Sequence, residues 1–171
     1  MPASTSSRSI ATTFGRVLLV AGLLVGATVI LPHAAAQVAV PAVGKHLYPA
    51  IDKASADIAA ALVEARRTHK RVLLDFGGDW CGDCQVLDIY FNEAPNAALL
   101  ANNFIKVNIN IGRMDANIDI AKKYGVPVHG VPALAVLDSR GKVIMAQDKE
   151  FADMRHMQSS SVTDFLNKWK G

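Results

Sequence analysis

Cysteine is scarce in this chain: among its 171 residues only Cys81 and Cys84 are cysteines, and they stand three positions apart. A scaffold held together by disulfides is therefore excluded, because a bridge that closes so short a loop constrains the unfolded chain very little. A zinc site is disfavoured as well, since it needs about two ligands beyond the pair and no second paired motif is present. We expect no metal site and interpret the pair as redox-active.

Strong charge of either sign is also missing. The chain has 18 Lys and Arg residues against 15 Asp and Glu residues, a formal net charge of +3. Two of the basic residues, Arg8 and Arg16, precede an apolar run, which leaves 16 basic against 15 acidic residues in the rest. No cluster of Lys and Arg marks a surface for nucleic acid or for an anionic membrane. We therefore expect no nucleic-acid partner.

A hydrophobic run long enough to span a bilayer is absent too. The apolar run from Val17 to Leu31 has 15 residues. At about 1.5 Å per residue, a helix of that length falls short of the roughly 30 Å hydrocarbon core. The run follows the positive residues Arg8 and Arg16 and precedes the small residues Ala34-Ala35-Ala36. This order is typical of a secretory signal.

We expect residues 1–36 to be a signal peptide that is cleaved before Gln37. The alternative is an uncleaved anchor formed by residues 17–31, which would tether the protein to a membrane. Either interpretation sends the rest of the chain to an oxidising compartment outside the cytoplasm. The layout favours the periplasm.

The remaining residues predict one domain over residues 48–170, preceded by an irregular lead-in over residues 37–47. Apolar residues at helical spacing predict helices over residues 48–69, 81–90, 97–102, 117–124 and 161–169. Short apolar or alternating runs predict strands over residues 72–76, 104–110, 133–137 and 142–146, the last two joined by a hairpin turn. This alternation indicates an α/β domain, with a mixed central sheet flanked by helices.

The cysteine pair stands where a predicted buried strand gives way to a predicted helix. The first turn of a helix offers unpaired backbone N–H groups and the positive end of the helix dipole. That environment stabilises a thiolate, which is the form of cysteine that attacks a disulfide. We therefore assign Cys81 as the nucleophile and Cys84, one turn further on, as the thiol that resolves the mixed disulfide.

Three motifs together resemble the thioredoxin superfamily: Asp75-Phe76, Trp80-Cys81-Gly82-Asp83-Cys84 and Gly130-Val131-Pro132-Ala133. The resemblance covers residues 72–146 and implies the thioredoxin fold. With Tyr90-Phe91-Asn92 and residues 97–102, the chain is most similar to small exported thioredoxin-like proteins and to the C-terminal domain of DsbD-type thiol:disulfide interchange proteins.

The resemblance also implies roles for residues around the cysteines. Pro132 is expected to follow a cis peptide bond beside the pair, and the backbone of Val131 to bind an extended substrate segment. Asp75 is expected to be a buried carboxylate that exchanges a proton with Cys84, and Lys106 to be its partner. The alternatives are a strand-entry proline, a solvated strand-end carboxylate and a surface lysine.

Trp80, Gly82 and Asp83 complete the predicted substrate-binding surface. Trp80 is expected to shield the sulfur atoms and to offer an apolar docking surface, although a place in the core is the alternative. Asp83 stands where a proline is usual in thioredoxins. Its negative charge, with that of Asp79, should disfavour a thiolate at Cys81 and so make the couple more reducing.

The sequence therefore predicts an exported protein-thiol:disulfide oxidoreductase, favoured as a reductase or electron relay. It implies no organic cofactor, because the Cys81–Cys84 disulfide carries the electrons. Its expected partners are protein thiols and disulfides and an upstream redox protein that donates electrons. The alternatives are a disulfide oxidase or isomerase, a copper metallochaperone that uses the cysteine pair, and a binding module that uses the Pro132 groove.

Overall fold

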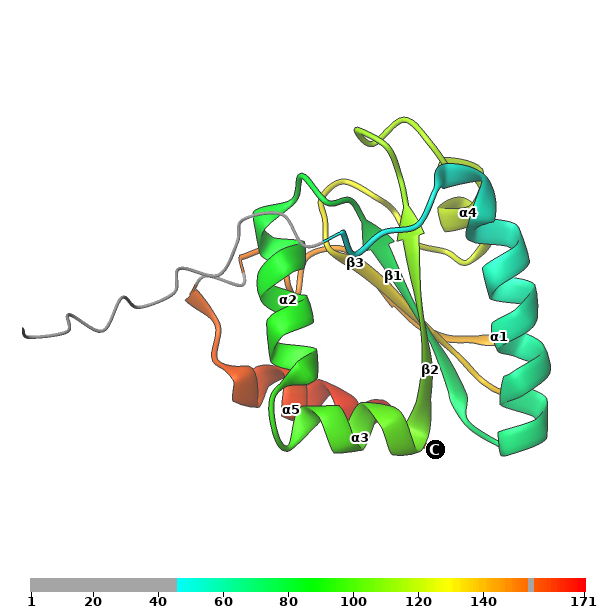
Figure 1. Ribbon diagram of the computed structural model, residues 1–171, viewed down its shortest axis with the longest axis vertical. Coiled ribbons are helices and arrows are strands. Elements are labelled where there is room, and N and C mark those ends of the chain that lie inside the picture. The colour runs from blue at the N-terminus through cyan, green and yellow to red at the C-terminus, as the bar shows by residue number, and fades with distance from the viewer. Residues whose placement is uncertain (1–45, 154–155) are drawn as a thin grey trace, which may run out of the picture. The chain divides into compact units, whose positions relative to one another are not determined.

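A four-stranded mixed sheet forms the centre of the computed structural model, which describes residues 46–153 and 156–171 (Figure 1). Its strands are β1 (Arg71–Gly77), β2 (Phe104–Asn110), β3 (Ala133–Leu137) and β4 (Val143–Gln147). Their order is β2-β1-β3-β4, with β1 parallel to β2 and antiparallel to β3, and with β3 antiparallel to β4. This is the mixed sheet that the sequence predicted.

Helices cover both faces of the sheet. They are the 3-10 helix η1 (Ile51–Lys53) and the α-helices α1 (Ala54–Thr68), α2 (Gly82–Asn92), α3 (Asn96–Asn103), α4 (Ile118–Lys123) and α5 (Ser159–Trp169). One hydrophobic cluster packs α1 and α4 against the sheet, and a second packs α2, α3 and α5 against the opposite face (Figure 1). The thioredoxin fold expected from the sequence is confirmed.

Strand β1 is central because it is apolar on both faces. Its residues from Val72 to Gly77 are all buried, and Asp75 is the only charged side chain among them. The strand runs directly into the loop that carries the cysteines, so a rigid, buried element fixes their position. It also places one carboxylate inside the core beneath that loop.

The predicted helix over residues 48–69 begins later than expected. Residues 46–50 form neither helix nor strand, with a bend at Tyr48, and helical structure starts only at Ile51. Pro49 accounts for the difference, because proline disfavours helical backbone at the residue before it. We call residues 46–49 the strap, since they run along the ends of β1 and β2 instead of joining α1.

In the part of the chain that the structure describes, no helix is both long and apolar enough to cross a membrane. The predicted signal peptide, its alternative as an anchor and most of the predicted lead-in lie outside the described residues.

Candidate active site

The two cysteines are joined in a disulfide at the start of α2. Cys81 is the N-cap of that helix, and the backbone N–H of Cys84 donates to the Cys81 sulfur at 3.0 Å. Both residues are buried, with 5% of Cys81 and 1% of Cys84 exposed. The pair therefore lies at the positive end of a helix, where a thiolate on Cys81 would receive the same N–H.

The loop before β3 forms a second wall of the site. The carbonyl oxygen of Val131 lies 3.7 Å from the Cys81 sulfur, and Val131 packs against the cluster that contains both cysteines. The peptide bond between Val131 and Pro132 is cis, and Pro132 is buried where β3 begins. The structure thus brings Val131 and Pro132 to Cys81 across 50 residues of sequence.

Asp75 lies in the core within a small network of charges. The Lys106 ammonium is 3.7 Å from Asp75 Oδ2 and donates to Asp88 Oδ1 at 3.0 Å. Desolvation raises the pKa of Asp75 above its ordinary value, and the nearby Lys106 charge only partly opposes this effect. The alternatives of a solvated Asp75 and a surface Lys106 are therefore wrong, since Asp75 is 1% exposed and the Lys106 side chain 15%.

Sequence reasoning missed Asp88 as a member of this network. It lies on α2 four residues after Cys84, so it occupies the same face of the helix one turn further on. That spacing was available in the sequence. The spacing does not identify the partner of Asp88, because that partner, Lys106, lies on β2 and is 18 positions further along the chain.

Tyr48 is the second functional candidate that the sequence analysis missed. Only 1% of it is exposed, and it clusters with Cys81 and Cys84. Its hydroxyl donates to Asp75 Oδ1 at 3.1 Å. Counting Tyr48 as the first residue of a helix hid this contact, which joins residues 27 positions apart.

Trp80 and Gly82 lie on the surface on either side of Cys81. Trp80 is 41% exposed, so the alternative of a core tryptophan is wrong. Its indole N–H donates to the carbonyl oxygen of Gly112 at 2.5 Å, and the Arg113 guanidinium lies 5.3 Å from its ring. A Cβ added at Gly82 would meet nothing within 4 Å, so the surface beside Cys81 is open. Asp83, the next residue, is half-buried.

Asp79 binds the strap. Its carboxylate accepts hydrogen bonds from the backbone N–H groups of Leu47 and Tyr48 at 2.7 and 3.0 Å, and lies 2.5 Å from His46 Nδ1. Although burial opposes them, these bonds hold the pKa of Asp79 below its usual value. The sequence treated Asp79 as a charge acting on Cys81, whereas in the structure its charge is engaged by the strap.

No metal centre accompanies the cysteines in the described residues: nowhere there do three or more His, Cys, Asp or Glu side chains gather in an arrangement that could hold an ion. The sequence contains no further cysteine. The Cys81–Cys84 disulfide is the redox group that the site presents.

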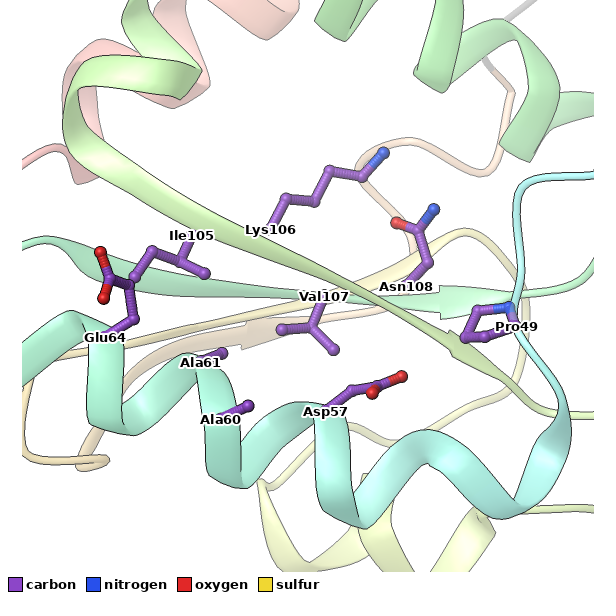
Figure 2. Close-up of a pocket in the computed structure, with 9 residues that line it drawn as sticks. All are labelled: Pro49, Asp57, Ala60, Ala61, Glu64, Ile105, Lys106, Val107 and Asn108. Atoms are coloured by element: carbon purple, nitrogen blue, oxygen red, sulfur yellow. The ribbon is translucent and has the colours of Figure 1, made fainter.

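A hollow of about 520 Å³ lies away from the cysteines, between α1 and the edge strand β2. Figure 2 shows Asp57 of α1 and Val107 of β2 facing each other across it, while Lys106 points to the opposite side of the strand. Neither cysteine lines this hollow. The sulfur atoms therefore lie outside it, although Lys106 both lines the hollow and pairs with Asp75.

Comparison with known proteins agrees with this geometry. A family model described as thioredoxin-like matches residues 53–139. The structure of a disulphide isomerase from Xylella fastidiosa Temecula1 is 36% identical, with a TM-score of 0.69, and the match covers 72% of this chain and 96% of that one. No curated protein sequence matches the chain.

Two thioredoxin structures are more distant. The oxidised thioredoxin from Plasmodium falciparum is 14% identical over 68% of this chain and 91% of its own, with a TM-score of 0.45. A mutant thioredoxin from Halobacterium salinarum is 24% identical over 63% of this chain and 81% of its own, with a TM-score of 0.43. The family match over more than half of the chain, together with the 36% identical relative, shows that this chain belongs to the thioredoxin-like family.

Proposed function

We propose that this chain is an exported protein-thiol:disulfide oxidoreductase that works as a reductase or electron relay. The observation that carries the proposal is the Cys81–Cys84 disulfide at the start of α2, with a buried carboxylate, Asp75, in the strand that leads to it. A structural bridge across three positions would stabilise the fold very little. Exchange with a substrate disulfide is the chemistry that such a pair performs well.

In the reducing direction, the reaction has two exchange steps. The Cys81 thiolate attacks one sulfur of the substrate disulfide, forms a mixed disulfide with it and releases the other sulfur as a thiolate. Cys84 then passes its proton to Asp75 and attacks the Cys81 sulfur. The Cys81–Cys84 disulfide forms, the bond from Cys81 to the substrate breaks, and the second substrate sulfur leaves as a thiolate. Two electrons have moved from the dithiol to the substrate.

Several surrounding groups support these steps. The N–H of Cys84 and the positive helix end stabilise the Cys81 thiolate, and Asp75 serves as the proton acceptor. Trp80, Gly82, Asp83 and the backbone of Val131 border the sulfur atoms and form the surface on which the substrate docks. Pro132 fixes Val131 against Cys81, and Lys106 pairs with the carboxylates.

An electron donor is also part of the proposal, because one disulfide stores only two electrons and the chain has no other cysteine. A partner redox protein must reduce the pair again after each turnover. Export rests on the layout of residues 1–36, and a mature N-terminus at Gln37, determined on protein recovered from periplasmic extracts, would support it. Recovery of the intact N-terminus in membranes would favour the anchor.

Reduction of insulin by dithiothreitol tests the activity. The purified protein should accelerate precipitation of the reduced insulin chains, and Cys81→Ser should remove the acceleration. Cys84→Ser should trap a mixed disulfide with the substrate that dithiothreitol releases. Wild-type protein that gives no acceleration over dithiothreitol alone would refute the proposal.

A second candidate is disulfide isomerase activity, because the 36% identical relative is described as a disulphide isomerase. An isomerase attacks a wrong disulfide and then lets the substrate resolve the mixed disulfide itself. Recovery of activity from scrambled ribonuclease would therefore persist in Cys84→Ser under isomerase action. If the protein acts only as a reductase, Cys84→Ser should not recover ribonuclease activity.

A further inference from the structure

The Tyr48 hydroxyl lies close to the sulfur of the resolving cysteine, Cys84, which points to a role beyond packing in the core. A Cβ added at Gly77 would lie 2.4 Å from the Tyr48 hydroxyl oxygen and 2.8 Å from the Cys84 sulfur. The two atoms therefore lie on the same side of Gly77, on either side of the space that a Cβ would fill. Glycine at this position is what lets the tyrosine approach so closely.

The hydroxyl of Tyr48 also completes the contacts of Asp75. Tyr48 donates to Oδ1 at 3.1 Å, while Lys106 lies 3.7 Å from Oδ2. The charged and titratable groups that face Asp75 are thus Tyr48 of the strap, Lys106 of β2 and Asp88 of α2. Burial, with Asp75 next to it, raises the pKa of Tyr48 well above its usual value, so the hydroxyl remains a donor.

Several hydrogen bonds fix the backbone of the strap, from which the Tyr48 side chain projects. Besides Asp79, which binds the N–H groups of Leu47 and Tyr48, the side-chain amides of Asn108 and Asn110 donate to the carbonyl oxygens of Leu47 and Pro49 at 2.8 and 3.0 Å. The backbone on both sides of Tyr48 is therefore fixed to the loop before Cys81 and to β2. Such anchoring sets the direction of the hydroxyl.

We propose that Tyr48 is a positioning residue for the second exchange step: its hydroxyl holds the Asp75 carboxylate toward Cys84, and its ring keeps water away from the pair. The inference rests on the proposed function, because it concerns the proton that leaves Cys84 before that thiol attacks Cys81. Tyr48 acts through Asp75 and takes no part in bond making. Its role belongs to the resolving step and not to the first attack.

A small aromatic disulfide whose leaving thiolate absorbs visible light separates the two steps. When it is mixed with the reduced protein, the first release of thiolate reports the attack by Cys81, and the second reports the attack by Cys84. Cys84→Ser should retain the first phase and lose the second. Stopped-flow absorbance at pH values from 5 to 9 or so then gives the pH profile of each phase.

Tyr48→Phe keeps the ring and removes the hydroxyl. Since hydrogen bonds to charged groups are worth roughly one to two pH units, we expect the midpoint of the second phase to move up by about one unit. At pH values below the wild-type midpoint, the rate of the second phase should fall about tenfold, while that of the first phase changes less than about twofold. Tyr90→Phe is the matched control, because the Tyr90 hydroxyl donates to the carbonyl of Met157 and lies in the other hydrophobic cluster.

A double-mutant cycle decides whether Tyr48 acts through Asp75. In an Asp75→Asn background, Tyr48→Phe should produce no further shift in the second phase. An equal slowing in both backgrounds, or an unchanged profile in Tyr48→Phe, would overturn the inference. Failure of the wild-type protein to reduce insulin would instead refute the proposed function, and the two-phase reaction would still report on Tyr48.

Discussion

At the scale of single residues, the proposed role of Asp75 as a proton acceptor requires a buried negative charge, and that charge lowers the stability of the fold. Burial raises the pKa of this carboxyl, against the opposing effects of Lys106 and of the hydrogen bond from Tyr48. A folded-state pKa above the unfolded one means that ionised Asp75 destabilises the fold. The stability linked to this group is present below about pH 4, where both states are protonated, and is lost as the pH rises through the folded-state pKa.

Asp75→Asn should therefore stabilise the oxidised protein at neutral and higher pH. Asparagine keeps the shape and can accept from the Tyr48 hydroxyl, but it carries no charge to bury. Urea unfolding of both proteins at pH 8 and at pH 4 measures the effect. The difference in the free energy of unfolding between Asp75→Asn and the wild type should be largest at pH 8 and should become smaller toward pH 4. A wild-type protein that is the more stable of the two at pH 8 would show that the ionised Asp75 is well compensated.

Lys106 should matter more for stability than its position on an edge strand indicates. Lys106→Met removes an ammonium that lies beside both Asp75 and Asp88. Breaking a buried ion pair from one side costs up to about 5 kcal/mol, and we expect roughly 2–3 kcal/mol here because Lys106 is partly exposed. The loss in the free energy of unfolding should be smaller in acid, because protonated Asp75 carries no charge that needs the lysine.

Urea unfolding at pH 7 and at pH 4 measures this prediction. Lys123→Met on α4 is the matched control, because Lys123 is exposed and should change the free energy of unfolding by less than about 0.5 kcal/mol. An equal effect of the two substitutions would contradict the buried network. A loss in Lys106→Met that does not diminish in acid would instead be assigned to the contact of the Lys106 ammonium with the Phe91 ring.

At the scale of elements, the strap is held by the side chains of Asp79, Asn108 and Asn110, and Asp79 is the charged one. Asp79 accepts from two consecutive N–H groups much as a helix N-cap does, and these bonds lower its pKa despite partial burial. Asp79→Ala leaves both donors without that acceptor and should cost about 1–2 kcal/mol at pH 7. A lowered pKa means that the stabilisation is present above about pH 4 and is lost as the pH falls through the folded-state value.

Amide hydrogen exchange at Leu47 and Tyr48 checks this prediction locally. Exchange there should speed up in Asp79→Ala and should stay slow in Asp138→Ala. The control is close in chemistry, because Asp138 also accepts two backbone N–H bonds, from Arg140 and Lys142, but it does so in the β3–β4 hairpin. Unchanged exchange at Tyr48 in Asp79→Ala would show that the asparagines of β2 hold the strap by themselves.

The elements that the sequence predicted best are those whose signals are local. The alternation of Ile105, Val107 and Ile109 gave the bounds of β2. The apolar run before the Asp138–Gly141 turn gave those of β3. The start of α1 was misplaced because Tyr48 fits a helical apolar pattern, while its actual partners lie 27 and 31 positions away.

The same distinction applies to the site. The spacing of Cys81 and Cys84 carries its meaning within four residues, and the structure places both at a helix start as expected. The contacts of Asp75 with Tyr48 and of Asp88 with Lys106 depend instead on how β1, β2, α2 and the strap pack together. No short pattern encodes that packing, so a single sequence could indicate the cysteines but not the network around them.

At the scale of the whole molecule, the fold positions a single redox couple, the Cys81–Cys84 pair, which exchanges two electrons. The cysteines form one small buried cluster with Tyr48, while the hollow of about 520 Å³ lies between α1 and β2. The direction of electron flow is therefore set by the relative stability of the dithiol and the disulfide. That balance is a property of the site as a unit and can be measured as one number.

We expect a reduction potential near the thioredoxin value of about −270 mV for the Cys81–Cys84 pair, by equilibration with dithiothreitol buffers. The negative side chain of Asp83 between the cysteines disfavours the thiolate and thus the reduced form. Asp83→Asn should accordingly raise the potential by about 10–30 mV, a change of up to about tenfold in the equilibrium constant. A wild-type potential near −120 mV would make the protein an oxidant. A lower potential in Asp83→Asn would show that Asp83 stabilises the reduced pair more than its charge opposes it.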